Sequence, residues 1–184
     1  MPSAKKRMTT RDLVLTGILL AVGTVIKAVF PKLPVTPNFI ISMYCLAVLL
    51  VRPTFLEAIG IGVVSAILAQ LTTGAAVPFI NFVSEPLGIA ACFLLCMIPF
   101  GKGFSGNILR PAVVTLLSTF VSGTVFVLVL SFVLLSRGAG AKYAMIYSVV
   151  VPTAVANMVI TTICYSPLRK VLRIQDEPAE SAAA

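Results

Sequence analysis

Apolar residues fill six long, continuous stretches of this chain, and short segments rich in proline, glycine and charge separate them. A helix of roughly 20 apolar residues is long enough to cross the ~30 Å hydrocarbon core of a bilayer. Continuous apolar runs favour helices over the alternating strands of a membrane barrel. The pattern therefore predicts an all-α integral membrane protein with six transmembrane helices, at residues 12–30, 37–51, 55–71, 79–100, 109–135 and 143–172.

Two of these predicted helices contain an internal proline. Pro86 cannot donate a hydrogen bond to the carbonyl of Phe82, and a proline disfavours helical geometry at the residue before it. We therefore expect the backbone of residues 81–86 to be broken and the continuous helix to begin at Pro86. We expect Pro152 to interrupt the last helix in a similar way.

Composition supports the membrane assignment and excludes a soluble enzyme domain. The 184 residues are 59% hydrophobic and 11% charged, and the mean hydropathy is +1.07, far from the values of soluble domains. The membrane domain would cover residues 12–173, between a basic segment at 1–11 and a disordered tail at 174–184.

The basic residues are distributed unequally between the two sides of this predicted topology. Three lie in the loops of one side: Lys32, Arg137 and Lys142. Ten lie on the side of the termini: Lys5, Lys6, Arg7, Arg11, Arg52, Lys102, Arg110, Arg169, Lys170 and Arg173. The positive-inside rule therefore predicts that both termini are cytoplasmic. Topology accounts for the net charge of +8, so no nucleic-acid partner is expected.

The four cysteines all fall within predicted helices, and the chain has no histidine. Cys92 and Cys96 share a helix face but have no acidic neighbour there. Buried, unreactive thiols are the better interpretation, and no metal site is expected.

Lys27 and Glu85 are charged residues placed well inside predicted helices, at similar depths of ~6 and ~9 Å from the outer ends at 1.5 Å per residue. A charge at the bilayer centre costs ~2.5–3.5 kcal/mol, so such residues need a partner. One interpretation is a structural salt bridge between the two. The other is a polar pocket that opens outward, in which Lys27 and Glu85 bind opposite charges of a ligand together with Asn38, Asn81 and Asn157. For Asn157 alone, a hydrogen bond between helices is an equally good explanation.

Three segments resemble a known family. They are "TPNFIISM" at the start of the second helix, "VVSAILAQLTTGAAVPFINFVSEP" from the third into the fourth, and "VVPTAVANMVITTICYSPLRKVL" in the last. Together they resemble the substrate-binding S components of energy-coupling-factor (ECF) transporters, and within these they are most similar to the tryptophan transporter family. The resemblance implies a multi-pass protein of the bacterial plasma membrane that captures a small molecule, with tryptophan as the expected ligand. It also implies partners: a transmembrane coupling protein and two cytoplasmic ATPases.

The resemblance further implies roles for individual residues. Small residues on the first helix of such proteins form the docking face for the coupling protein, and here Gly17 and Ala21 have a suitable spacing, although ordinary packing within the bundle explains them equally well. An amino-acid ligand would place its ammonium at Glu85 and its carboxylate at Lys27 or a helix end. Four aromatic residues could then face the indole ring: Phe39, Phe79, Phe82 and Tyr147.

The chain differs from the family pattern at one place, and several alternative ligands and functions remain open. The residues before the helix-four proline are Ser84 and Glu85, whereas the tryptophan branch has an acidic residue followed by a basic one, so another vitamin-like ligand stays possible. A stand-alone proton-coupled carrier and a non-transporting membrane protein are the rival functions. The chain has no GxxxxGK[ST] phosphate loop, so it is not expected to be an enzyme or to hold a cofactor, and ATP hydrolysis would belong to the partners.

Overall fold

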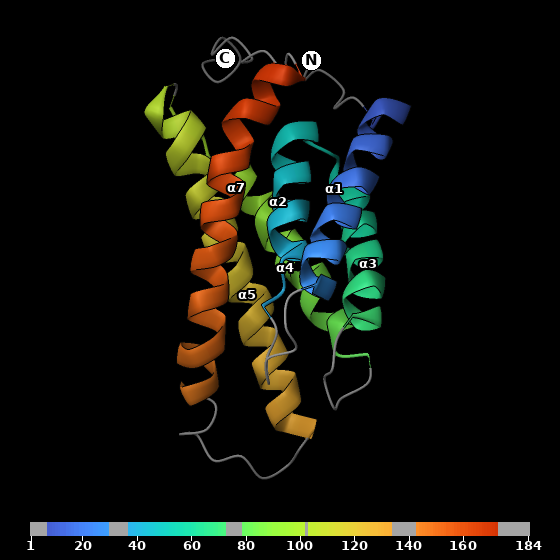
Figure 1. Ribbon diagram of the computed structural model, residues 1–184, viewed down its shortest axis with the longest axis vertical. Coiled ribbons are helices and arrows are strands. Elements are labelled where there is room, and N and C mark those ends of the chain that lie inside the picture. Colours follow the sequence, from blue (N-terminus) through green and yellow to red (C-terminus); the bar gives the residue numbers. More distant parts are fainter. Residues whose placement is uncertain (1–6, 30–36, 73–78, 102, 134–142, 173–184) are drawn as a thin grey trace.

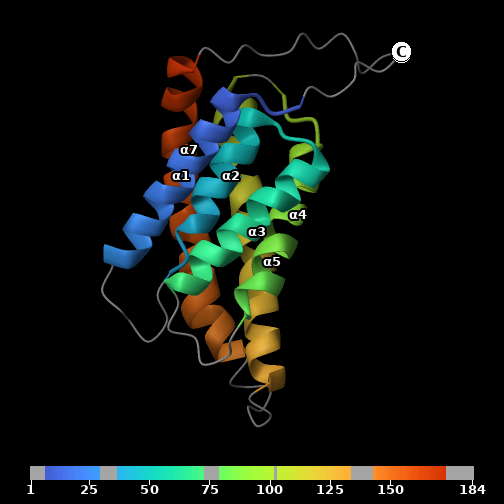
Figure 2. The ribbon, with the colours of Figure 1, turned by 90° about the vertical axis from the view of Figure 1, so that its right-hand side faces the viewer.

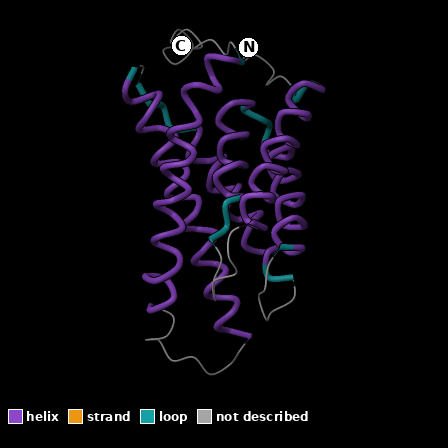
Figure 3. Tube along the Cα trace, viewed as in Figure 1, coloured by secondary structure: helices purple, strands orange, loops and turns teal. Residues whose placement is uncertain are grey.

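The computed structural model describes residues 7–29, 37–72, 79–101, 103–133 and 143–172. This part of the chain contains helices and loops but no β-strand (Figure 3), which confirms the all-α prediction. The α-helices are α1 (Thr10–Val29), α2 (Ile40–Val51), α3 (Phe55–Leu71), α4 (Asn81–Cys96), α5 (Arg110–Val133) and α7 (Val151–Val171). Two π-helical segments, η1 (Ser105–Leu109) and η2 (Ile146–Val150), lead directly into α5 and α7.

The helices run alternately up and down in one bundle, so that the start of α1 and the end of α7 lie at the same end (Figure 1). A hydrogen bond joins them there, from the Arg11 guanidinium to the Leu172 carbonyl at 3.2 Å. The backbone N–H of Met8 donates to Glu57 Oε1 at 2.9 Å, which ties the same end to the start of α3. We call this the basic end, because it carries Arg7, Arg11, Arg52, Arg110, Arg169 and Lys170.

Helix α2 lies in the centre of the bundle (Figure 2). Every residue from Ile40 to Leu50 is buried, and α2 contacts each of the five other α-helices named above. Its 12 residues give a length of only ~18 Å at 1.5 Å per residue. The surrounding helices therefore separate α2 from the lipid, and it does not need to match the thickness of a bilayer by itself.

Three segments are long and apolar enough to cross a membrane: Thr10–Val29, Ser105–Phe132 and Tyr143–Val171. Helices α2, α3 and α4 are apolar but shorter, with 12, 17 and 16 residues. All six predicted helices are present, and the predicted bounds of α3 match the observed ones. Within the described residues the structure thus confirms the six predicted helices, of which three have the length of a membrane span.

The expectation of a broken backbone at residues 81–86 is wrong. Helix α4 begins at Asn81 and continues through Pro86. Proline removes a single hydrogen bond here, the one to the Phe82 carbonyl. Ser84, Glu85 and the residues one turn further on are buried in the bundle, and this packing maintains the helix because unpaired backbone is costly inside a membrane.

Pro111 and Pro152, near the starts of α5 and α7, are accommodated by wider turns. Pro111 follows η1 and Pro152 follows η2. A proline ring clashes with the carbonyl four residues earlier in an α-helix, and a π-helical turn moves that carbonyl away. The last helix is therefore locally widened before Pro152, and the fifth begins earlier than predicted, within the Gly/Ser-rich segment expected to be a loop.

A pair of glycines on α3 provides a test of this packing. A Cβ atom at Gly62 would lie 2.5 Å from Ile89 Cγ2 and 3.2 Å from the backbone Cα of Pro86, whereas one at Gly60 would have no neighbour within 4 Å. We expect Gly62→Ala to lower the melting temperature in detergent, since overpacking costs about 1–3 kcal/mol. Gly60→Ala should leave it unchanged or raise it slightly, because alanine is the better helix former. Equal melting temperatures would contradict the close contact of α3 and α4.

Candidate functional site

A cluster of buried polar side chains lies at the end of the bundle away from the basic end. At its centre is Glu85 on α4, only 1% exposed. The amide of Asn38, two residues before α2, donates to Glu85 Oε1 at 2.7 Å, and the Ser122 hydroxyl of α5 donates to the same oxygen at 3.4 Å. The other carboxylate oxygen, Oε2, is buried without a hydrogen-bond partner. Two neighbours therefore orient the carboxylate and leave one oxygen available.

Asn157 of α7 completes this network from the opposite side. It is fully buried, and its amide nitrogen donates to the backbone carbonyl of Asn38 at 3.0 Å and to Thr119 Oγ1 at 3.4 Å. The amide oxygens of Asn38 and Asn157 are buried without partners. We call Asn38, Glu85, Ser122 and Asn157 the polar cluster; it brings together the head of α2 with α4, α5 and α7.

Lys27 lies near the cluster but is bonded elsewhere. It is 6% exposed in the last turn of α1, and its ammonium donates to the carbonyl of Ala69 at 3.3 Å. Ala69 lies in the last turn of α3, where the helix dipole favours a cation. Lys27 and Glu85 interact through their opposite charges, but no direct ion pair joins these two described residues. Lys27 therefore anchors α1 to α3 rather than forming a direct salt bridge with Glu85.

The remaining predicted ligand residues are separate from the polar cluster. Asn81 is buried and donates to Gln70 Oε1 at 3.0 Å, which joins the start of α4 to the end of α3. Phe82 is 39% exposed and Tyr147 is 71% exposed, so both side chains contribute to the surface of the bundle. Of the other two aromatic candidates, Phe39 is buried and Phe79 is exposed. Their roles in binding stay predictions.

Sequence reasoning missed the contribution of α5. Thr115, Ser118, Thr119 and Ser122 are all buried, and their spacing of three, four and seven residues places them on one face of a helix. This periodic row of hydroxyls in an otherwise apolar run was the signal that could have identified Ser122. Tyr44 was also missed: it is fully buried, and a Cβ atom at Gly88 would lie 2.5 Å from its hydroxyl. A single tyrosine in an apolar run gives no such signal.

The predicted docking residues lie on the outer face of α1. Gly17 and Ala21 are both exposed, and a Cβ atom at Gly17 would have no neighbour within 4 Å. Packing within this bundle therefore does not explain the glycine. The face is available to another molecule.

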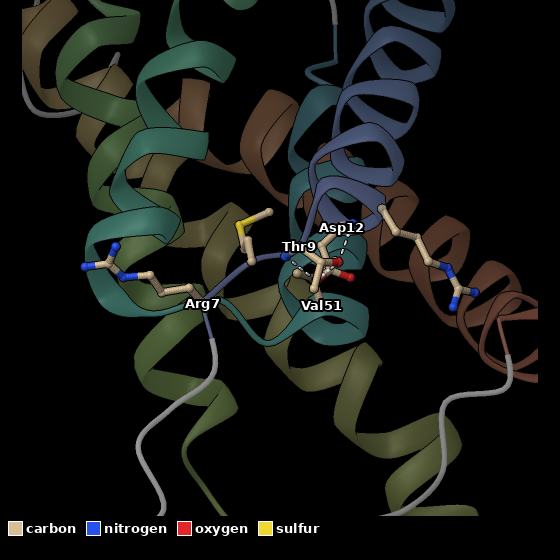
Figure 4. A pocket seen from close by; sticks show the side chains of 6 residues that line it. Arg7, Thr9, Asp12 and Val51 are labelled. Carbon is tan, nitrogen blue, oxygen red and sulfur yellow. Dashed lines mark hydrogen bonds between the residues drawn. The ribbon is translucent and has the colours of Figure 1, made fainter.

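A separate pocket of about 370 Å³ lies at the basic end (Figure 4). Thr9 and Asp12 lie side by side in it, and both the N–H and the hydroxyl of Thr9 donate to Asp12 Oδ2, at 2.9 and 2.8 Å. Its lining is Arg7, Met8, Thr9, Arg11, Asp12 and Val51. No residue predicted to bind the ligand lines this pocket.

An apolar helical bundle that buries a carboxylate, a lysine and several amides is typical of membrane proteins that handle a polar ligand or ion. The chain belongs to the tryptophan transporter family, since the family model described as "Tryptophan transporter TrpP" matches residues 9–173. It is also similar to a "Probable tryptophan transport protein" of Clostridium acetobutylicum, with 27% identity over 174 residues, which cover 91% of this chain and 97% of that protein. No solved structure matches the chain significantly. The family match confirms the resemblance seen in the sequence.

Proposed function

We propose that this chain is the substrate-binding membrane subunit, or S component, of an ECF-type importer and that its ligand is tryptophan. One observation carries the proposal: Glu85 is buried inside a membrane-type bundle with one oxygen fixed by two donors and the other unpaired. A buried carboxylate of this kind is a ready partner for an ammonium group. The family and the name of the Clostridium acetobutylicum relative support tryptophan as the molecule that carries it.

In this proposal all six helices cross the cell membrane and both termini are cytoplasmic. Of the described basic residues, all except Lys27 lie at the basic end of the bundle, which the positive-inside rule assigns to the cytoplasm. The polar cluster then lies in the outer half, where a ligand from outside would reach it. The short α2 agrees with this arrangement because its neighbours shield it from lipid.

The topology can be tested with single cysteines in a chain whose four native cysteines are replaced. Thr10→Cys lies at the basic end and Phe79→Cys at the other, and both side chains are exposed. An impermeant maleimide should label Phe79→Cys in intact cells and Thr10→Cys only after permeabilisation. The opposite pattern would overturn the proposed orientation.

The ligand site can be tested by titrating purified protein with tryptophan. The chain contains no tryptophan, so the fluorescence of the ligand is observed without a protein indole background. Glu85→Gln keeps the size of the side chain and one acceptor, and we expect the affinity to fall by roughly 30-fold to several thousand-fold, as for the loss of one partner of a buried charge pair.

The matched control is Glu57→Gln at the basic end. Glu57 accepts a hydrogen bond from Met8 and caps α3, so its replacement should lower thermal stability without changing the affinity. An unchanged dissociation constant for Glu85→Gln would show that Glu85 has only a structural role.

The docking role of α1 requires a different measurement. We expect Gly17→Leu combined with Ala21→Leu to abolish co-purification with the ATPase subunits and uptake, because the larger side chains prevent close approach of a partner helix. Tryptophan affinity should stay near normal. Gly60→Leu, at an equally open glycine of α3, is the control and should retain co-purification. Proton-driven uptake by this chain alone would instead favour the stand-alone carrier.

A further inference from the structure

We propose that the polar cluster recognises its ligand through the ammonium group and not through the carboxylate, so that the ligands it accepts are primary arylalkylamines in general. This inference rests on the proposed function in one respect, that the polar cluster is the ligand site. It goes further by assigning the group that is bound and the class of molecules that can compete.

The first argument is the set of unpaired atoms. Three buried oxygens in the cluster have no hydrogen-bond partner: Glu85 Oε2, Asn38 Oδ1 and Asn157 Oδ1. All three are acceptors, and leaving a buried acceptor unpaired destabilises the structure. An alkylammonium group brings three N–H donors and a positive charge. The cluster therefore lacks what an ammonium group provides.

The second argument is that the orientation of both amides is fixed. The Asn38 nitrogen donates to the Glu85 carboxylate at 2.7 Å, and the Asn157 nitrogen donates to a backbone carbonyl at 3.0 Å. Carboxylate and carbonyl oxygens can only accept. Turning either amide around would bring two acceptors together at these distances, so the amide oxygens must be the ends that remain free.

The third argument is the position of the lysine. A carboxylate ligand would need a cation or a helix end, and Lys27, the one basic residue that the structure describes at this end of the bundle, already donates to the Ala69 carbonyl at the end of α3. Lys27 also interacts with the opposite charge of Glu85, and Glu85 would repel a ligand carboxylate brought to the same place. An ammonium that meets the unpaired oxygens breaks none of the hydrogen bonds described above. Charge and hydrogen bonding thus both favour the amine.

Two analogues of tryptophan separate the two groups. Tryptamine has the amine without the carboxylate, and indole-3-propionate has the carboxylate without the amine. On the full chain in detergent, we expect the dissociation constant of tryptamine to lie within about tenfold of that of tryptophan. Indole-3-propionate should bind at least about 100-fold more weakly than tryptamine, because sites built to bond an N–H group strongly reject analogues that lack it.

Failure of tryptamine to bind, or comparable binding of indole-3-propionate, would overturn the inference. Tryptophan binding in that case would leave the proposed function intact, whereas tryptamine binding without tryptophan binding would overturn the tryptophan assignment alone.

Titrations in choline and in sodium buffers complete the test. Amine binding that appears only with sodium would place the metal ion at these oxygens and would also overturn the inference.

Variants on α7 connect the result to the cluster. Asn157→Leu removes one of the three oxygens and should weaken tryptamine binding by about tenfold or more. If the leucine variant is not monodisperse, Asn157→Ala is measured in its place. The matched control is Thr161→Val, one turn further along, where a fully buried hydroxyl donates to the Ser42 carbonyl. Both changes should lower the melting temperature, but Thr161→Val should leave the tryptamine affinity within about twofold. Equal effects of the two variants on affinity would contradict the assignment of Asn157.

Discussion

The bundle is organised around the need to keep one carboxylate out of water without leaving it unpaired. An isolated ion in a membrane interior is costly, and hydrogen-bond donors reduce that cost. Asn38 provides such a donor. Helix α2 begins only at Ile40, so Asn38, just before it, lies at the level of Glu85 and within hydrogen-bond distance of its carboxylate. The backbone carbonyl of the same residue accepts from Asn157. One residue at the head of the central helix therefore fixes the positions of α4 and α7 relative to each other.

Charged side chains have different roles at the two ends of the bundle. At the basic end, guanidinium groups donate to carbonyls near helix C-termini, as Arg11 does to Leu172 and Arg110 does to Cys96. Cations at these positions complement the helix dipole and can remain partly hydrated. At the other end, a carboxylate and amides are buried and only partly satisfied. The same unequal distribution of charge thus agrees with the proposed orientation in the membrane and with the proposed site for an ammonium group.

The helices could be predicted because long apolar runs have few other structures open to them in a membrane. The path of the chain at Pro86 could not be predicted from the sequence, since the packing of Ser84 and Glu85 outweighs the local preference of proline against a helix. Lys27 and Glu85 are both buried, as their places in the apolar runs indicated, but the hydrogen-bond partner of Lys27 is a backbone carbonyl, which no side-chain pattern reveals. Tyr147 was chosen for its aromatic ring, and its exposure depends on how η2 is rotated against the bundle, which periodicity alone does not determine.

The two faces of helix α1 have different surroundings, so a proposed docking face can be changed without disturbing the packing of the bundle. Its inner face carries Lys27 and Gly23, and a Cβ atom at Gly23 would lie 2.8 Å from the Met43 side chain, so this glycine is required for packing against α2. Gly17 lies on the outer face and meets nothing. Lipid is as apolar as leucine, so an exposed apolar helix face in a membrane needs no protein partner for stability. What distinguishes the outer face of α1 is therefore the small size of Gly17 and Ala21, which allows another backbone to approach closely, and not its hydrophobicity.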